Sequence, residues 1–186
     1  MENDIRLNEE GLSGKRKVLT FQVCQDLFAT EVMVIKEIIE YDNVTRVPMV
    51  PEYIRGVINL RGRVLPVIDL AVRLDKTASP ITRRSCIIII ELEIEDEIMD
   101  VGLMVDAVRE VLDIGEEEIS PPPSFGSDIR PEFISGLGRV QKKLINLLNL
   151  DTVLAIDQLA MFSTEMQGLG AQLLIGTGTE AEHVHA

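Results

Sequence analysis

IRGVINLRGRVLPVIDL, residues 54–70, is the stretch that decides the fold of this chain. Two runs rich in Val, Ile and Leu flank a tip of Arg61, Gly62 and Arg63, which is typical of paired strands in a small barrel. Gly62 can adopt a positive φ at a turn without steric cost. The stretch holds no catalytic motif, so we expect a hairpin that presents two arginines to another protein. A tip that is charged only for solubility is the alternative interpretation.

The hairpin belongs to an internal repeat. Residues 51–57, PEYIRGV, match residues 131–137, PEFISGL, at an offset of 80 (131 minus 51), and residues 67–70 match residues 147–150 at the same offset. Two copies of one unit predict two similar small barrels related by an approximate twofold. The alternative is chance similarity between short apolar strings, and the common order of the matches speaks against it.

The upstream part of the repeat has a smaller offset. Residues 35–38 resemble residues 108–111 at an offset of 73 (108 minus 35), so the second copy carries about seven extra residues between the motifs. The prolines at 121–123 lie in this extra segment. Residues 18–21 and 87–90 would then be the first strands of the two copies.

Periodicity and turn residues predict a mostly β chain with flexible ends. The expected units are a flexible arm at 1–15, a first barrel at about 16–74, a linker at 75–84, a second barrel at about 85–150 and a flexible tail at 168–186, with exchange of strands between the barrels left open. Strands are expected at 17–24, 27–31, 35–40, 56–60, 63–68, 85–93, 98–105, 107–112, 134–139 and 143–148. Helical segments are expected at 51–53, after an Asp69 cap, and at 151–167 after an Asp151 cap.

The composition indicates a core of branched aliphatic residues. Hydrophobic residues make up 46% of the chain and aromatic residues 4%, with no Trp, and Ile and Val favour strands. The longest apolar run, 86–90, is far shorter than the roughly 20 residues that a membrane helix needs, and no leader-like segment opens the chain. We therefore expect a cytoplasmic protein without membrane insertion. Cys24 and Cys86 lack metal or redox spacing and are expected to be small buried hydrophobes.

The net charge of −13 argues against nucleic acid as a partner. Acidic residues crowd 91–100 and 116–118, and a surface of this sign repels phosphate backbones and anionic lipid. Nucleic-acid binders usually show a basic face. The basic clusters at 15–17, 83–84 and 142–143 are short and scattered, so we interpret most charges as solvated.

No constellation of residues indicates catalysis. His183 and His185 are the only histidines, and they lie in the expected tail, away from any general-base or metal-site pattern. The chain has no glycine-rich phosphate loop before a helix and no GxSxG elbow. The carboxylates of 91–100 lack the glycine and ligand spacing of a calcium loop and are interpreted as a solvated strand face. We expect a binding protein that is not an enzyme, with no cofactor and no metal.

Four pieces of the chain occur in order at workable spacing: LTFQVCQDLFATEVMVIKEIIEY at 19–41, the hairpin at 54–70, VGLMVDAVREVLDI at 101–114 and ISGLGRVQKKLINLLNLDTVL at 134–154. Together they resemble the CheW-like chemotaxis coupling proteins. The resemblance implies two five-stranded SH3-like barrels over about 16–154 plus a C-terminal helix. It also implies a bacterial scaffold that couples the cytoplasmic tip of methyl-accepting chemoreceptors to the regulatory domain of a CheA-type histidine kinase and is recruited to membrane receptor arrays.

The same resemblance implies a receptor-binding groove between the barrels. Its matching positions here are Ile35, Glu37, Ile38, Gly56, Arg61, Val105 and Val108. Aliphatic side chains supply a dry groove for an amphipathic helix, and charges at its edge fix orientation. The alternative is that the aliphatic positions are core and that the Glu and Arg form a structural salt bridge with each other. For the kinase, the resemblance implies strand edges and loops, which we place around Val44, Arg46 and Met49.

Some features depart from the family pattern or leave the function open. Cys24 and Gln25 stand where a hairpin glycine is usual, so we expect a wider first turn, and the tail beyond Leu154 is longer than the family core requires. One functional alternative is a coupling protein of a non-flagellar chemosensory-like pathway. Another is a small-molecule sensor that uses the inter-barrel groove, and the low aromatic content speaks mildly against it. A phosphorylation-controlled adaptor would need a receiver domain for which the chain has no room.

Overall fold

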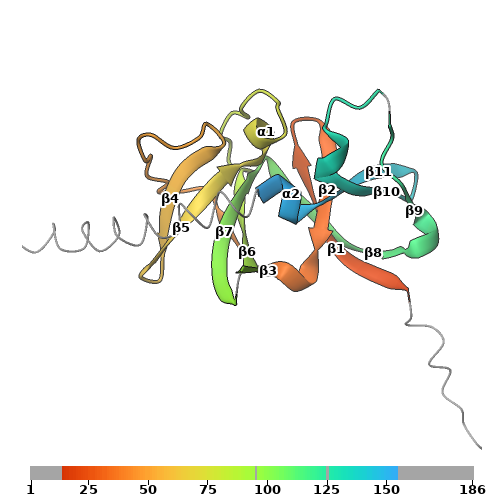
Figure 1. Ribbon diagram of the computed structural model, residues 1–186, viewed down its shortest axis with the longest axis horizontal. Helices are drawn as coiled ribbons and strands as arrows, with labels where there is room; N and C mark the ends of the chain where they lie inside the picture. Colours follow the sequence, from red (N-terminus) through yellow and green to blue (C-terminus); the bar gives the residue numbers. More distant parts are fainter. Residues whose placement is uncertain (1–13, 95, 125, 155–186) are drawn as a thin grey trace, which may run out of the picture.

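The computed structural model describes residues 14–154 apart from residues 95 and 125, and two β-sheets make up most of this part of the chain (Figure 1). Sheet A has the order β8-β1-β2-β11-β10-β9 and sheet B the order β3-β6-β7-β5-β4. The strands of sheet A are β1 (Lys15–Val23), β2 (Asp26–Glu31), β8 (Ala107–Gly115), β9 (Ile119–Ser120), β10 (Ile134–Val140) and β11 (Lys143–Leu148). Those of sheet B are β3 (Ile35–Glu40), β4 (Ile54–Leu60), β5 (Arg63–Asp69), β6 (Cys86–Ile94) and β7 (Glu97–Val105). The expected mostly β class is confirmed.

Each sheet draws strands from both copies of the repeat. β1 and β2 pair with β8 and β11, whereas β6 and β7 pair with β3 and β5. When β1 is matched to β6, β2 to β7, β3 to β8, β4 to β10 and β5 to β11, the two sheets have the same strand order apart from the added β9. The barrels are therefore exchanged: the first two strands of one copy complete the barrel that the last three strands of the other copy begin.

The expected bounds of 16–74 and 85–150 left strand exchange open, and the strand order of the two sheets shows exchange. A single residue, Asp106, separates β7 from β8, and a β-hairpin needs at least two loop residues. The chain therefore cannot turn back within sheet B and continues into sheet A. In the first copy, the three-residue turn η2 (Val32–Val34) carries the chain from β2 in sheet A to β3 in sheet B.

Both barrels close at equivalent positions. Thr45, which follows β3, exchanges backbone hydrogen bonds of 2.9 and 2.8 Å with Val57 of β4. In the other barrel β9, which follows β8, pairs Ser120 with Leu137 of β10. Val57 and Leu137 are related by the repeat offset of 80 (137 minus 57), so the same step closes each sheet into a barrel, here called barrel A and barrel B after their sheets.

Three apolar clusters fill the molecule. One lies inside barrel A and one inside barrel B, and the largest joins the two sheets. In β6, Ile87 and Ile89 belong to the interior of barrel B, whereas Ile88 and Ile90 belong to the central cluster. The run of four isoleucines therefore marks a strand that is buried on both faces, as continuous apolar runs do. The rest of the central cluster includes Phe21, Phe28 and Phe133.

Short helical segments follow equivalent strands. α1 (Leu70–Arg73) follows β5 and α2 (Leu150–Leu154) follows β11, while η3 (Glu116–Glu118) and η4 (Pro131–Phe133) precede β9 and β10. Asp69 caps α1 as expected, with its side chain accepting from the Val72 backbone N–H. At α2 the expectation was wrong. Asn149, the repeat equivalent of Asp69, accepts from the Thr152 N–H at 3.5 Å in place of the expected Asp151 cap.

Two local expectations also differ from the structure, namely the width of the first turn and the burial of the cysteines. The first turn is tight rather than wide, because Val23 pairs with Asp26 and Cys24 takes a φ of 56°. At 51–53 the expected turn is present as one hydrogen-bonded turn, with the Ile54 N–H donating to the Pro51 carbonyl at 2.9 Å, and the repeat equivalents of these residues form η4. The two cysteines, Cys24 and Cys86, are half-buried rather than buried.

Several expectations lie outside the described residues. These are most of the arm at 1–15, the helix beyond residue 154, and the tail at 168–186 with His183 and His185. Within the described ranges, no helix has the length and apolar character needed to cross a bilayer.

Candidate functional site

Glu37 and Arg61 form a bidentate ion pair on barrel B. The two guanidinium nitrogens of Arg61 lie 2.8 and 3.0 Å from the two carboxylate oxygens of Glu37. β3 carries Glu37, and the β4–β5 turn carries Arg61 at a φ of 51°, followed by Gly62 at 82°. The Arg61 side chain is 77% exposed and that of Glu37 is 26% exposed. The salt bridge that was the alternative interpretation of these two residues is thus present, and it leaves most of the Arg61 side chain accessible.

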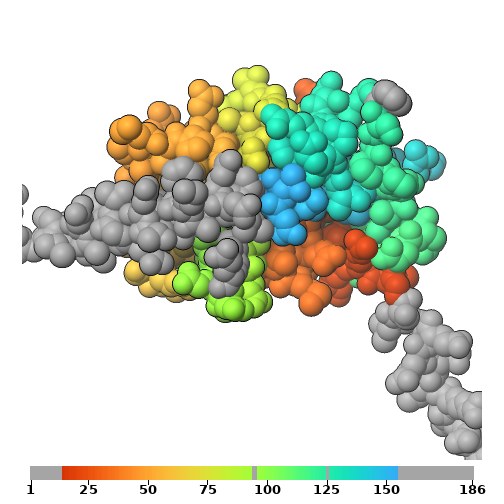
Figure 2. All heavy atoms as spheres, viewed as in Figure 1, coloured from red at the N-terminus to blue at the C-terminus, as the bar shows by residue number. Residues whose placement is uncertain are grey.

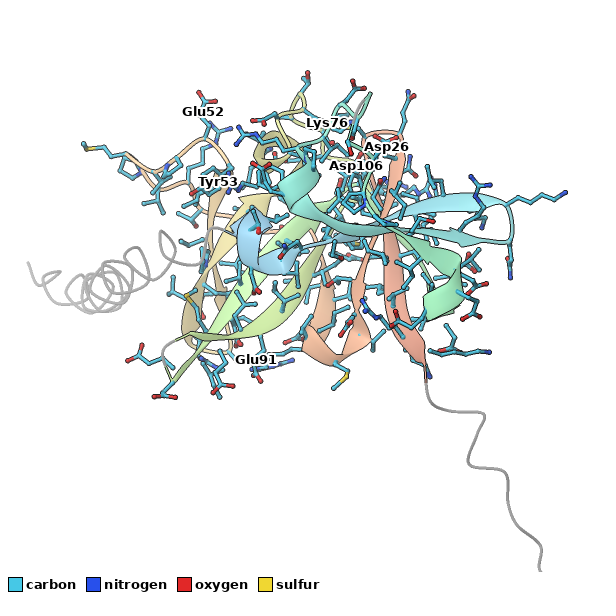
Figure 3. All side chains as sticks on the ribbon, turned by 45° about the vertical axis from the view of Figure 1, so that its right-hand side comes forward. Asp26, Glu52, Tyr53, Lys76, Glu91 and Asp106 are labelled. Carbon is cyan, nitrogen blue, oxygen red and sulfur yellow. The ribbon has the colours of Figure 1, made fainter. Side chains whose placement is uncertain are left out.

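A second set of ion pairs lies on the same barrel. The Lys36 Nζ lies 2.9 Å from a Glu91 oxygen and 3.1 Å from Asp100 Oδ2, and an Arg63 nitrogen lies 3.2 Å from the same Asp100 oxygen. Glu91 and Asp100 face each other across β6 and β7, and Glu91 lies toward the lower end of the molecule in Figure 3. Hydrogen bonding to Glu91, and next to Asp100, raises the pKa of Lys36 above its usual 10.5.

These charges lie where the interior of barrel B ends. Along β6, Glu91 continues the inward alternation of Ile87 and Ile89, and along β5, Arg63 continues that of Leu65 and Val67. A ring of paired charges therefore closes the apolar interior on the side of the β4–β5 and β6–β7 turns. The arrangement can orient a charged partner, and it has no feature of a catalytic centre such as a nucleophile beside a base.

The aliphatic positions of the predicted groove differ in exposure. Val105 is 1% exposed and belongs to the central cluster, so its side chain is core. Ile35 on β3 and Val108 on β8 are half-buried and pack against that cluster from different sheets. Ile38 is 42% exposed on β3. The structure thus brings Glu37, Arg61 and Ile38 to the surface of barrel B and leaves Val105 beneath it.

The close approach of Thr45 to β4 explains why position 56 is a glycine. A β carbon at this position would lie 2.2 Å from the carbonyl oxygen of Thr45, and the residue has a φ of 154°. Only glycine lets the barrel-closing segment approach β4 this closely. The equivalent Gly136 meets β9 in the same way, with Ile119 Cγ2 at 2.8 Å from its hypothetical β carbon.

The residues expected to meet the kinase lie in the segment between β3 and β4. Val44 packs partly against the interior of barrel B, and Arg46 is exposed. Met49 is 100% exposed at a φ of 62°. These three residues surround the Thr45–Val57 closure rather than the Glu37–Arg61 pair, so the two predicted contact regions lie on different parts of barrel B.

Sequence reasoning missed Lys36 and Asp100 as members of the site, and it expected Arg63 at the hairpin tip without its Asp100 partner. The acidic stretch 91–100 was interpreted as a solvated face, whereas the Asp100 side chain is only 9% exposed and pairs with two cations. The available signal was the alternation of β6, which continues inward to Glu91. The partners come from β3 and β5, and their register could not be obtained from local pattern.

Comparisons with known proteins agree with this architecture. Residues 17–158 match the family model described as CheW-like domain. The chain is 38% identical over 141 residues to the "Probable chemotaxis protein CheW" of Rhizobium etli, covering 75% of this chain and 88% of that protein. It is 36% identical over 142 residues to the "Chemotaxis protein CheW" of Rhizobium meliloti, covering 76% and 88%.

A solved structure gives the same result at the level of the fold. The scaffolding protein TtCheW from Thermoanaerobacter tengcongensis superposes with a TM-score of 0.67 at 34% identity, over 74% of this chain and 91% of that one. A family match over residues 17–158 spans both exchanged barrels. On these grounds the chain belongs to the CheW-like family.

Proposed function

We propose that this chain is an adaptor of a chemotaxis signalling pathway and acts by binding rather than by catalysis. The observation that carries the proposal is the match of residues 17–158 to the CheW-like family. The adaptor couples methyl-accepting chemoreceptors to a CheA-type histidine kinase. It works in the cytoplasm, at receptor arrays on the membrane.

Receptor binding is assigned to the surface around the Glu37–Arg61 pair. Arg61 and Ile38 are exposed and can contact a receptor helix directly, while the ion pair holds the guanidinium in one orientation. Ile35 and Val108, which are half-buried against the central cluster, are proposed to supply apolar contact area where the two sheets meet. The two remaining predicted positions, Val105 and Gly56, are proposed to act indirectly, the first by filling the core and the second by allowing barrel closure.

Kinase binding is assigned to the segment around Val44, Arg46 and Met49. Met49 presents a flexible apolar side chain, a type that adapts to varied partner surfaces. Within the described residues, Arg46 has no ion-pair partner at its side chain and is available for a carboxylate of the kinase. Because this segment lies away from the Glu37–Arg61 pair, both partners can be bound at once.

A three-component pull-down tests the proposal. The full chain is combined with a soluble receptor signalling fragment and with the kinase, each alone and together. Arg61→Glu and Glu37→Arg should each abolish receptor binding and leave kinase binding unchanged. Met49→Glu should do the reverse. A folded chain that binds neither partner would refute the adaptor function.

The charge-swapped double variant separates direct recognition from structural support. Glu37→Arg combined with Arg61→Glu restores an ion pair of reversed polarity. If the receptor contacts the positive charge of Arg61 directly, the double variant should not bind the receptor. If the ion pair only supports the structure of the surface, receptor binding should return. Arg16→Glu is the matched control, because Arg16 forms an exposed ion pair with Glu116 at 3.0 Å on barrel A and should bind like the wild type.

A further inference from the structure

The β10–β11 hairpin of barrel A carries cations that its equivalent in barrel B neutralises. In barrel B, Arg61 and Arg63 each contact a carboxylate of the same barrel. The hairpin of barrel A carries Arg139, Lys142 and Lys143. Of these three, only Lys143 has an ion-pair partner among the residues that the structure describes, namely Glu110 of β8 at 3.1 Å.

The Glu110–Lys143 pair locates this surface in the repeat. Glu110 is the repeat equivalent of Glu37, at the offset of 73 (110 minus 37), so both barrels place a glutamate beside the hairpin turn. Next to it on β8, Arg109 donates to the side-chain oxygen of Gln22 and contacts no carboxylate in the described part of the chain. Of the four cations Arg109, Arg139, Lys142 and Lys143, here called the cationic tip, only Lys143 therefore has a carboxylate partner in the described part of the chain.

The turn itself holds a cation in an unfavourable backbone conformation. Lys142 has a φ of 63° and follows Gln141 at 50°. The equivalent position in barrel B is Gly62, which takes a φ of 82° without steric cost. Lys142 is exposed, and its positive φ is a strained conformation for a residue with a side chain. Strained positions of this kind cluster at binding sites.

A hollow beside the hairpin gives a partner room to enter. Its volume is about 530 Å³, and its polar lining comprises Thr20, Gln22, Gln25, Asp26, Arg109, Glu110 and Lys143. The two carboxylates of this lining are each paired, Asp26 with Lys76 at 3.0 Å and Glu110 with Lys143 at 3.1 Å. The amide groups of the two glutamines can hydrogen-bond a carboxylate or a peptide backbone. The β10–β11 turn projects at the end of the molecule away from sheet B, as Figure 1 shows.

We propose that the cationic tip and its hollow bind an acidic polypeptide segment of a partner protein. Three of the four cations of the tip have no carboxylate partner among the described residues, and they give it a local positive charge on a chain whose net charge is −13. A short acidic segment meets mainly this local charge, because interactions beyond about 8–10 Å are screened at physiological salt. DNA or an anionic membrane would extend over the acidic remainder of the surface and be repelled by it. This site is separate from the proposed receptor surface on barrel B.

Fluorescence anisotropy with the full chain tests the assignment. The probe is a short labelled peptide of alternating Glu and Gly, and the comparison peptide has Gln in place of Glu. The Glu peptide should bind at low salt and the Gln peptide should not. Arg139→Ser combined with Lys142→Gly should raise the Kd by about fivefold to twentyfold, as expected for loss of two exposed ionic contacts. The melting temperature should not fall, because Gly suits the turn at position 142.

The matched control removes the same charge elsewhere. Lys15 and Lys17 lie near the start of β1, and Lys17 is five residues from Gln22, or about 17 Å along the strand. Lys15→Ser combined with Lys17→Ser should change the Kd less than about twofold, as distant screened charges do. The proposal would be overturned if both double variants lost the same affinity for the Glu peptide, or if the wild type did not bind that peptide. It would also be overturned if the tip bound duplex DNA or anionic vesicles instead of the peptide.

Discussion

Arg73 of α1 lies over the ring of Phe133, with its guanidinium carbon 5.0 Å from the ring centroid. The same group lies 4.8 Å from the ring of Tyr53, the repeat equivalent of Phe133. It also donates to the backbone carbonyls of Thr152 and Val153 in α2. One side chain thus contacts both repeat copies where α1 and α2 approach each other (Figure 1), beside the central apolar cluster that joins the two sheets. In Figure 2 the residues of α2 (blue) lie at the surface between the two barrels.

Replacing Arg73 should therefore weaken the contacts between the two repeat copies. Arg73→Lys should lower the free energy of unfolding by about 1–2 kcal/mol, because a lysine lacks the planar fork that bonds two carbonyls and stacks on rings. Urea denaturation measures the change. Arg130→Lys is the control: Arg130 also lies over Phe133, at 5.4 Å, but pairs with Asp75 at the surface, and it should lose less than about 1 kcal/mol. Equal losses in the two variants would contradict the role given to Arg73.

The two glycines of the β4–β5 hairpin should respond differently to a methyl group. At Gly56 an added β carbon would lie 2.2 Å from the Thr45 carbonyl oxygen, whereas at Gly62 nothing lies within 4 Å. Gly56→Ala should lower the free energy of unfolding by about 3 kcal/mol or more, because the barrel closure must move. Gly62→Ala should lose only about 1–2 kcal/mol, from its φ of 82°. Thermal melts of both variants compare the two effects, and similar melting temperatures would show that the closure is not constrained at Gly56.

Asp69 should make stability depend on pH in the acid range. Burial raises its pKa above the usual 3.8, and the Val72 hydrogen bond and the Arg55 charge oppose this only in part. Between 3.8 and the raised folded-state pKa, the native protein binds more protons than the unfolded chain. The contribution of Asp69 to the free energy of unfolding therefore falls as pH rises through this window.

Asp69→Asn removes that titration and keeps the helix cap, as Asn149 does in the second copy. The stability of the variant minus that of the wild type should become more positive from below pH 3.8 to neutral pH, measured by urea denaturation at each pH. Asp69→Ala should be less stable by about 1 kcal/mol from loss of the cap. A difference between Asn variant and wild type that stays flat or falls with rising pH would refute the raised pKa.

The two sets of ion pairs on barrel B should differ in their contribution to stability. Asp100 is nearly buried and pairs with Lys36 and Arg63, so Asp100→Ala should lower the free energy of unfolding by about 2 kcal/mol. Arg61→Ala should change it by less than about 1 kcal/mol, because that pair is exposed. Denaturation in low and high salt measures both. A larger loss for the Arg61 variant would mean that receptor-binding defects in Arg61 variants reflect unfolding.

Asp100 also contributes to the titration of Lys36. The raised pKa of Lys36 means that its contribution to stability is present below pH 10.5 and is lost as pH rises through the higher folded-state pKa. Asp100→Asn should lower the pKa of Lys36 toward its usual value, which NMR of the Lys36 side chain can follow. An unchanged pKa would assign the shift to Glu91 alone.

Local patterns predicted most strand positions. The alternation around Gly62, the isoleucine run of β6 and the Asp69 cap all depend on neighbouring residues, and the structure places each as expected. Two local predictions failed. At the first turn a distant contact is involved, because the Asp106 carboxylate accepts from the Cys24 N–H at 2.7 Å and Cys24 takes a positive φ. At α2 the failure is local, since Asn149, the residue before the helix, accepts from the Thr152 N–H in place of Asp151.

The sequence by itself determined the strand segments, the repeat and the family, because periodicity and motif order are properties of residues close together in the chain. Only the tertiary structure decided which copy completes each barrel, which aliphatic positions are core, and which charges meet. Lys36 and Asp100 are 64 positions apart and come together through the β3–β6 and β6–β7 registers. The pairing register of the strands is set by burial of the apolar faces of whole sheets, so it cannot be predicted from a local sequence pattern.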